Sequence, residues 1–151
     1  MKLSTKGRYG LRAMIDLAIH SGDEAVSIAS IAARQKISES YLEQLIPKLR
    51  KAGMIVSVRG AGGGYKLAKP ANEISVGDIL RALEGNLDPV DCAGLPGASG
   101  CEESGGCVTK YVWQKINESI NQTVDGINLE ELIRESNQNG ERKLNSGACK
   151  K

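Results

Sequence analysis

The chain has 151 residues, of which 40% are hydrophobic but only 3% aromatic, with no phenylalanine, so its core must be aliphatic. Nothing approaches the roughly 18 consecutive apolar residues of a membrane span, and the first residues lack a secretory apolar segment, so we expect a cytoplasmic protein with no membrane partner. The net charge of +2 conceals a basic first part, with 12 Lys and Arg against 5 Asp and Glu in residues 1–70 and 8 against 13 thereafter, which favours nucleic-acid binding over an ordinary solvated surface.

Hydrophobic residues at helical spacing predict three helices in the first third of the chain. The first covers about residues 5–20 and carries the apolar stripe Leu11, Met14, Ile15, Ala18 and Ile19. Ser27 and Ser38 are typical N-cap residues for the second and third helices, and Gly53 is a natural end for the third. The buried stripe of the third helix consists of Leu42, Leu45, Ile46 and Leu49.

Two short apolar segments, residues 54–58 and 65–68, follow and are separated by the sequence RGAGGG. This pattern predicts a β-hairpin with a glycine-rich tip. Helices followed by such a hairpin are typical of a winged helix-turn-helix, whose third helix enters the major groove of double-stranded DNA. Helical bundles without a DNA role share the three helices, but the basic charge and Arg59 at the hairpin tip favour DNA.

The second half of the chain begins with Ser75 and Asp78, which predict a capping box for a helix over residues 76–84. A glycine-rich loop over residues 85–107 comes next. Beyond it an apolar residue recurs every four positions, which predicts a long helix with one apolar seam: Val108, Val112, Ile116, Ile120 and Val124. The seam must be buried. It could pack on its own domain, but we expect a symmetric partner helix in a homodimer.

Asn128 and Glu131 predict a final capped helix, and the polar chain from Ser136 onward is expected to be disordered. The expected fold class is mainly α: a winged helix-turn-helix with a two-stranded wing, a cysteine-rich loop and a long dimerisation helix. The expected domains are a DNA-binding domain over residues 1–86, a cysteine-rich loop over 87–107, a dimerisation helix and C-terminal helix over 108–135, and a disordered tail over 136–151.

The third predicted helix supplies most of the candidate DNA contacts, because its face opposite Leu42 is polar and basic. Gln can bond two adenine atoms at once, and Ser and Tyr can reach a base edge or a phosphate, which selects Ser38, Ser40, Tyr41 and Gln44. Phosphate contacts are expected from Lys48, Arg50 and Lys51. Arg59 is expected in the minor groove. Additional backbone contacts from the first helix are expected from Ser4, Lys6 and Tyr9.

Three of the four cysteines, Cys92, Cys101 and Cys107, lie within sixteen residues of one glycine-rich loop. Clustered cysteines in a cytosolic chain bind metal or react more often than they form structural disulfides. Three soft thiolates suit zinc or an iron–sulfur cluster, and the lack of a CxxC pair favours the cluster over zinc. Inert thiols are the remaining alternative. We expect this loop to bind a cluster.

The sequence resembles the IscR family of iron–sulfur-responsive winged-helix regulators from Met1 to about Ser136. The resemblance rests on LSTKGRYG at 3–10, SESYLEQLIPKLRKAG at 38–53, SVRGAGGGY at 57–65, and the three-cysteine loop followed by a helix. It implies a homodimer that binds a 2Fe–2S cluster, senses cluster supply and regulates the genes of iron–sulfur assembly. It implies no enzymatic activity.

The fourth cluster ligand is the point at which this chain departs from the family. The first cysteine gap holds eight residues where five is common, and Lys110 stands where many members have a histidine ligand. The only histidine, His20, lies in the first predicted helix. The resemblance implies that the residue at position 43 lies near the cluster loop and bears on DNA choice, so Glu43 is the predicted ligand. Cys149 is the rival ligand, and an ordinary solvated glutamate is the alternative role for Glu43.

Two other functions are compatible with these patterns. Within the same fold, the protein could be a repressor that senses nitric oxide or iron through destruction of its cluster. In a different class, it could be a small iron–sulfur electron carrier, but such a carrier needs neither a wing nor a DNA-reading helix. The stretch GAGGG lacks the Lys-Ser/Thr of a nucleotide-binding loop, which speaks against an enzyme that uses nucleotides.

Overall fold

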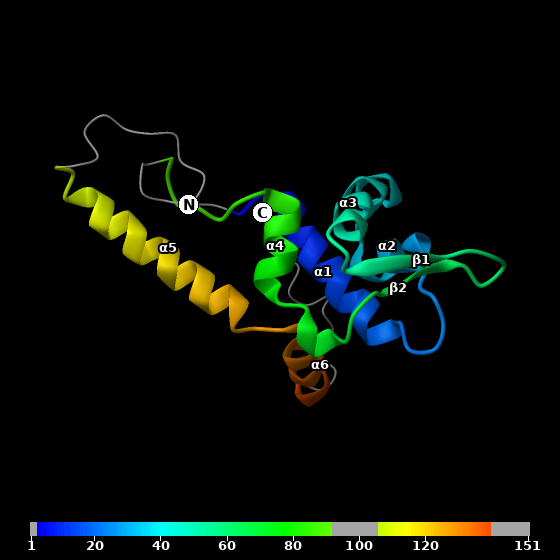
Figure 1. Ribbon diagram of the computed structural model, residues 1–151. Coiled ribbons are helices and arrows are strands. Elements are labelled where there is room, and N and C mark those ends of the chain that lie inside the picture. The colour runs from blue at the N-terminus through cyan, green and yellow to red at the C-terminus, as the bar shows by residue number, and fades with distance from the viewer. Residues whose placement is uncertain (1–2, 92–105, 140–151) are drawn as a thin grey trace.

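The computed structural model describes residues 3–91 and 106–139 of the chain. The elements within these residues are α1 (Thr5–His20), α2 (Ile28–Gln35), α3 (Glu39–Lys51), β1 (Ile55–Val58), β2 (Gly64–Leu67), the 3-10 turn η1 (Ala71–Glu73), α4 (Val76–Glu84), α5 (Thr109–Asp125) and α6 (Leu129–Gln138). The mainly helical fold class and the winged helix-turn-helix order are confirmed. In Figure 1, α1 to α4, the sheet and α6 form one globular part, which we call the head, and α5 projects from it.

The core of the head is aliphatic, as the composition predicts. Helix α1 lies at its centre and packs against α2, α3, α4 and α6. The side chains that are almost fully buried include Met14, Leu17, Ile31, Leu42, Leu45, Leu49, Ile55, Ile74, Ile79 and Leu129. No helix among the described residues combines the length and apolar character needed to cross a membrane.

Helix starts follow the predicted capping residues. The side chains of Ser27, Ser38, Ser75 and Asn128 each accept a hydrogen bond from the backbone N–H three residues later. The Asp78 side chain in turn accepts a hydrogen bond from the Ser75 N–H, which completes the predicted capping box. These bonds satisfy helix N–H groups that have no partner inside the helix.

The two-stranded wing is also bonded to the connection between α1 and α2, a contact that the sequence did not predict. Strands β1 and β2 pair antiparallel, with Ile55 opposite Leu67. In addition, Val26, in the connection between α1 and α2, exchanges two backbone hydrogen bonds with Tyr65 of β2, at 2.9 and 2.8 Å. Gly64 makes this approach possible, because a Cβ there would collide with the Val26 carbonyl.

A buried charged group joins α1 to α2. Asp16 is completely buried and accepts hydrogen bonds from both Arg34 (Nη2, 2.7 Å) and Gln35 (Nε2, 2.9 Å). The bond to Asp16 raises the pKa of Arg34 above its ordinary value. A buried carboxylate with this many donors is satisfied only while all of them stay in place.

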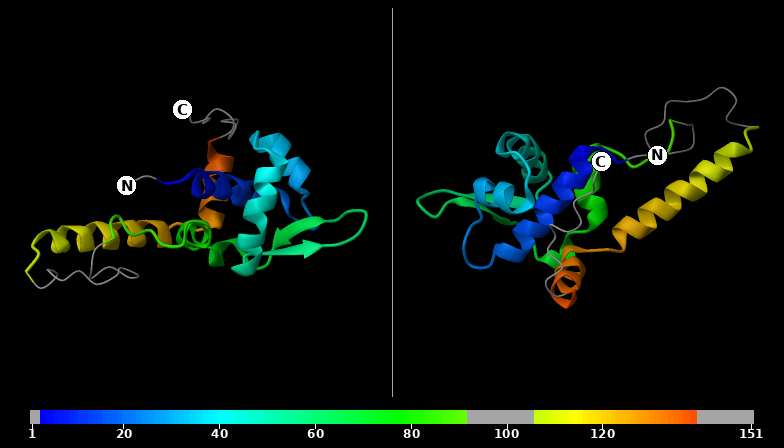
Figure 2. Two further views of the ribbon diagram at one scale, coloured as in Figure 1. Left: turned by 90° about the horizontal axis from the view of Figure 1, so that it is seen from above. Right: turned by 180° about the vertical axis from the view of Figure 1, so that it is seen from behind.

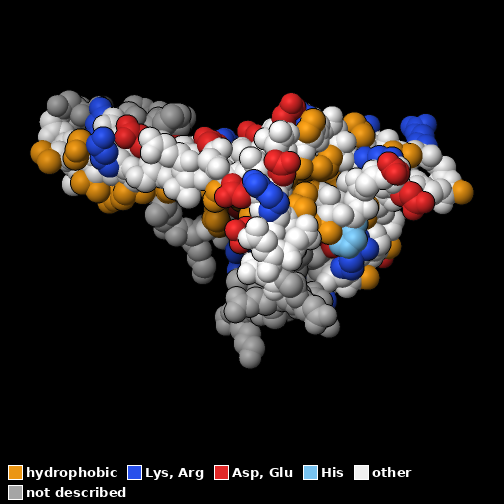
Figure 3. Space-filling view, turned by 90° about the horizontal axis from the view of Figure 1, so that it is seen from below, with side chains coloured by type: hydrophobic (Ala, Val, Ile, Leu, Met, Phe, Trp, Pro, Cys, Tyr) orange, Lys and Arg blue, Asp and Glu red, His pale blue; other side chains and the backbone are white. Residues whose placement is uncertain are grey.

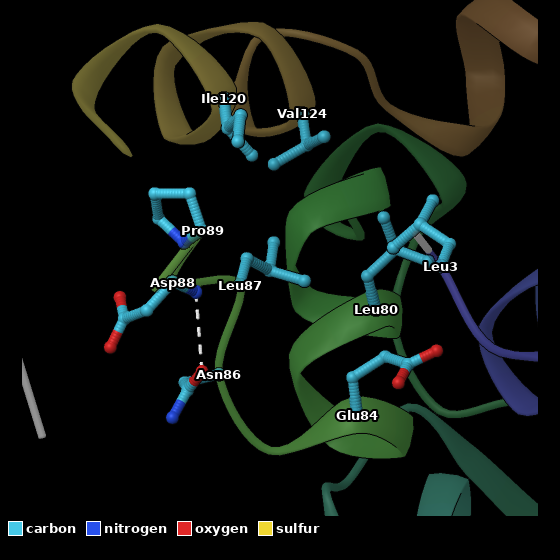
Figure 4. Close-up of a pocket in the computed structure, with 9 residues that line it drawn as sticks. All are labelled: Leu3, Leu80, Glu84, Asn86, Leu87, Asp88, Pro89, Ile120 and Val124. Carbon is cyan, nitrogen blue, oxygen red and sulfur yellow. Dashed lines mark hydrogen bonds between the residues drawn. The ribbon is translucent and has the colours of Figure 1, made fainter. Parts of the chain in front are cut away.

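Helix α5 is attached to α4 mainly at its C-terminal end. Arg81 of α4 binds Asp125 through Nη1 at 2.7 Å and Asn121 through Nη2 at 2.5 Å. Gly77 leaves room for Asp125, since a Cβ at position 77 would overlap its carboxylate. Figure 4 shows Ile120 and Val124 facing Leu80 and the loop after α4, around an apolar pocket.

The predicted start of the tail at residue 136 is wrong, because α6 continues to Gln138. Buried Leu129 and half-buried Leu132 anchor this helix near its beginning. The polar residues that follow can extend it at little cost, because exposed serine, asparagine and glutamine differ from better helix formers by less than about 1 kcal/mol each.

We expect Asp16→Ala to lower the free energy of unfolding by about 2–4 kcal/mol, because it leaves donors of Arg34 and Gln35 without their buried acceptor. Urea unfolding of the two proteins measures the difference. Asp23→Ala, which removes an exposed carboxylate from the connection between α1 and α2, is the control and should change the free energy of unfolding by less than about 0.5 kcal/mol. Equal losses in the two variants would show that the buried Asp16 contributes no more to the free energy of unfolding than an exposed carboxylate does.

Candidate DNA-binding surface and cysteine loop

Helix α3 presents one polar face to solvent, as predicted. Its buried side is made of Leu42, Leu45, Ile46 and Leu49. The predicted contact residues Ser40, Gln44, Lys48, Arg50 and Lys51 are all exposed, as are Ser38 and Glu43. The basic residues lie in the last turn. We call α3 the reading helix, because it offers hydrogen-bonding groups along its length and positive charge at its end.

The predicted contact residue Tyr41 lies against α1. Its hydroxyl donates to Thr5 Oγ1 at 3.1 Å, and its ring meets Tyr9 edge-on with centroids 5.9 Å apart. The guanidinium groups of Arg8 and Arg12 lie 5.9 and 5.5 Å from the centroid of the Tyr9 ring. The Tyr41 side chain is therefore held against α1 by Thr5 and Tyr9. Sequence reasoning missed Thr5, since only the fold brings it to Tyr41.

Ser4, another predicted backbone contact, is already engaged by α4. Its N–H and its hydroxyl donate to Glu84 Oε1 at 3.0 and 2.5 Å, and the Gly7 N–H donates to the same oxygen at 3.1 Å. Figure 4 shows the Glu84 side chain pointing from α4 toward the segment at Leu3. No signal in the sequence marks Glu84, whose partners lie 77 and 80 residues away.

Predicted phosphate contacts from two helices come together at one depression of the surface. Lys6 of α1 and Lys48 and Lys51 of the reading helix line it, beside the end of α4. Arg50 lies at a neighbouring depression with Pro47 and Tyr65. Positive charge gathered in this way attracts the sugar–phosphate backbone whatever the base sequence.

Arg59 is exposed at the start of the wing tip, as predicted. The Gly63 N–H donates to the Gly60 carbonyl at 2.9 Å and closes a tight turn. Gly60 has a φ of +115°, and a Cβ on Gly63 would lie 2.7 Å from the Val58 carbonyl oxygen. Arg59 therefore precedes a tight turn that needs glycine at positions 60 and 63.

Cys107 is the one cysteine of the predicted cluster site that lies within the described residues. Its side chain is exposed, immediately before α5, and Sγ lies 3.0 Å from Thr109 Oγ1. Cys92 and Cys101, and the rival ligand Cys149, lie outside the described residues. The donor set fits an iron–sulfur cluster by its chemistry, since thiolates are the protein ligands such clusters use.

The structure does not bring Glu43 and Cys107 of one chain together. Glu43 is on the exposed side of the reading helix, whereas Cys107 precedes the far end of α5, and all views place these elements on opposite sides of the molecule (Figures 1 and 2). The only histidine, His20, has its Nδ1 2.8 Å from the Asp16 carbonyl oxygen, within α1.

Comparison with protein families places the chain among transcription factors. Residues 3–135 match the Rrf2 family, described as an iron-dependent transcriptional regulator. The HTH-type transcriptional regulator IscR of Pectobacterium carotovorum subsp. carotovorum (strain PC1) is 44% identical over 133 residues, which are 88% of this chain and 79% of the relative. Its counterpart in Aliivibrio salmonicida (strain LFI1238) is 45% identical, with 88% and 77% covered.

Solved structures of similar proteins share the fold. T. potens IscR superposes with a TM-score of 0.75 at 46% identity, covering 93% of this chain and 91% of that one. CymR (YrzC), the global cysteine regulator of B. subtilis, superposes with a TM-score of 0.73 at 41% identity, covering 89% and 98%.

We expect Arg59→Ala to weaken binding to a selected duplex more than Lys48→Ala does, because an arginine in the minor groove reads its width as well as its charge. Fluorescence anisotropy at several salt concentrations measures both losses. The loss in Lys48→Ala should shrink as salt rises, and the loss in Arg59→Ala should persist. Losses that are equal and shrink in parallel would make Arg59 another phosphate contact.

Proposed function

Because this chain belongs to the Rrf2 family of iron-dependent transcriptional regulators, we propose that it is a cytoplasmic homodimer that binds operator DNA and controls iron–sulfur assembly genes through a 2Fe–2S cluster. The observation that carries this proposal is that the three-cysteine loop is joined in the chain to the part of the molecule with the candidate DNA-binding surface. The loop with three cysteines joins α4, which packs against α1 of the head, to α5, which projects from the head. Binding or loss of a cluster in that loop is therefore proposed to change the position of the head, which contains the reading helix.

Different residues of the head are proposed to contact base edges, phosphates and the minor groove of the DNA. Ser40 and Gln44, exposed on the reading helix, are proposed to read base edges. Lys6, Lys48 and Lys51 are proposed to bind phosphates, which their shared depression supports. Arg59 on the glycine turn is proposed to enter the minor groove, as its exposure at the wing tip allows.

The cluster is proposed to be held by Cys92, Cys101 and Cys107. When bound, it supplies an iron–thiolate group whose occupancy follows the supply of clusters. Within one chain, α3, which carries Glu43, lies far from the start of α5, which Cys107 precedes (Figure 1). As a fourth ligand, Glu43 is therefore proposed to come from a second chain. Its recruitment into the cluster would remove a negative side chain from the DNA-facing surface.

The second chain is proposed to pack along the outer half of α5. The apolar seam of this helix divides in two. Ile120 and Val124 lie near α4 of their own chain, whereas Val108 and Val112 are 83% and 44% exposed, and the neighbouring Tyr111 is 63% exposed. Figure 3 shows hydrophobic side chains gathered at the outer end of this helix and along one edge of it. An apolar stripe of this kind is stable in water only when something covers it.

Val112→Glu is expected to produce monomers, because it places a charge on the exposed part of the seam without touching the Ile120 contact with α4. Analytical ultracentrifugation at micromolar concentration measures the change. Gln122→Glu, at an exposed position on the same helix, is the control and should leave the dimer intact. An intact Val112→Glu dimer would exclude this surface as the interface.

For the cluster, Glu43→Ala is expected to shift or bleach the visible absorption of the anaerobically purified protein and to relax base preference in the cluster-free form. Cys149→Ala is the matched variant for the rival ligand and should leave the spectrum unchanged. An unchanged spectrum in Glu43→Ala together with loss of colour in Cys149→Ala would assign the ligand to Cys149.

Mössbauer spectra of the same samples distinguish 2Fe–2S from 4Fe–4S and from a protein without iron. A colourless protein that contains zinc, or no metal, would overturn the proposed cofactor. A cluster that exposure to nitric oxide destroys, with release of DNA, would instead favour the nitric oxide sensor. A cluster protein that binds no duplex would favour the electron carrier.

A further inference from the structure

The structure assigns Glu84 as a positioning residue that links Tyr41 on the reading helix to the segment entering the cysteine loop. The link has three steps, each made by contacts between described residues. They run from the end of α4 to the first turn of α1, from that turn to Tyr41, and from the end of α4 toward the loop and α5.

In the first step, Glu84 caps α1 from outside the helix. The Ser4 side chain makes no capping bond of its own to α1. The Glu84 carboxylate instead accepts from the Ser4 and Gly7 N–H groups at 3.0 and 3.1 Å. It is a negative charge at the positive end of the helix dipole. A Cβ at position 7 would lie 2.6 Å from Glu84 Oε1, so glycine is needed there for the cap to form.

In the second step, the capped turn holds the reading helix. Thr5 belongs to the turn that Glu84 fixes, and Thr5 Oγ1 accepts the Tyr41 hydroxyl at 3.1 Å. The Tyr9 ring, edge-on to Tyr41, restrains the same side chain from the next turn of α1. Loss of the Glu84 cap would loosen the turn that carries Thr5 and so release the Tyr41 hydroxyl.

In the third step, Glu84 lies where the cysteine loop begins. It is the last residue of α4 and is followed by Gly85, with a φ of +92°, and then by only six residues before Cys92. One helical turn earlier, Arg81 binds Asp125 and Asn121 of α5, the helix that leaves the loop. The last turn of α4 therefore contacts both α1 and α5, and a change in the loop acts on it. This step, unlike the first two, rests on the proposed function.

The test of the first two steps uses cluster-free protein and a duplex selected from a random library by the wild type. The measured quantity is the ratio of the Kd values for a scrambled and the selected duplex at one salt concentration. Glu84→Ala and Tyr41→Phe should each lower this ratio about fivefold, as expected for the loss of one hydrogen bond. The double variant should lose no more than either single variant, because both remove the same link.

Glu73→Ala, at an exposed position on η1, is the control and should keep the ratio. Glu84→Gln keeps an acceptor oxygen and should retain most of the ratio. If Glu84→Ala does not fold, Gly7→Ala replaces it and should lower the ratio in the same way, because its Cβ would displace the Glu84 carboxylate. A role in stability alone would lower the melting temperature of Glu84→Ala but leave the ratio unchanged. Either that result or additive losses in the double variant would overturn the assignment.

The third step is tested by comparing cluster-loaded and cluster-free protein on the selected duplex. Glu84→Ala should bring the two Kd values to within about twofold of each other, while Glu73→Ala keeps the wild-type difference. A variant that keeps the full difference would overturn the link to the loop. No difference in the wild type itself would overturn the proposed function, and the first two steps would be judged by the duplex experiment alone.

Discussion

The close approach of α1 to α4 is the contact on which the rest of the molecule depends. Gly7 and Gly10 make it possible, because a Cβ at either position would collide with Glu84 or Leu83. Helix α1 also provides the central wall of the aliphatic core and the surface on which Tyr41 rests. Helix α1 therefore contacts the reading helix on one side and α4, which in turn contacts α5, on the other.

The two attachments of α4 are chemically different. Against α1 it uses apolar packing and a shielded carboxylate, which demand a close fit. Against α5 it uses a half-exposed ion pair between Arg81 and Asp125, which keeps the pKa of Asp125 below its ordinary value. Ion pairs in contact with water contribute little to stability and allow small rearrangements. The head is thus a firm unit, and its junction with the projecting helix is the more adjustable of the two.

Local patterns in the sequence predicted most of the fold. Caps such as Ser38 and Ser75 act over three residues, and the apolar stripe of α3 repeats within one helix, so both are readable without knowing the fold. The contact between Glu84 and Ser4 joins residues 80 positions apart, and no local pattern in the sequence indicates it. Glu43 could be chosen only by resemblance, and no local pattern indicates that α5, which Cys107 precedes, projects away from the part of the molecule that contains α3.

The pairing of Val26 with Tyr65 has a consequence for the DNA itself. It fastens β2 to the connection between α1 and α2, so the wing cannot swing independently of the helices. The distance from Arg59 to the reading helix is then nearly constant, and a bound duplex has to match it. If Arg59 enters the minor groove as proposed, sequences whose groove is already narrow at that distance would fit without cost, whereas sequences with a wider groove would have to be deformed. Under that proposal, base pairs that no side chain touches would contribute to operator choice through the energy needed to deform the double helix.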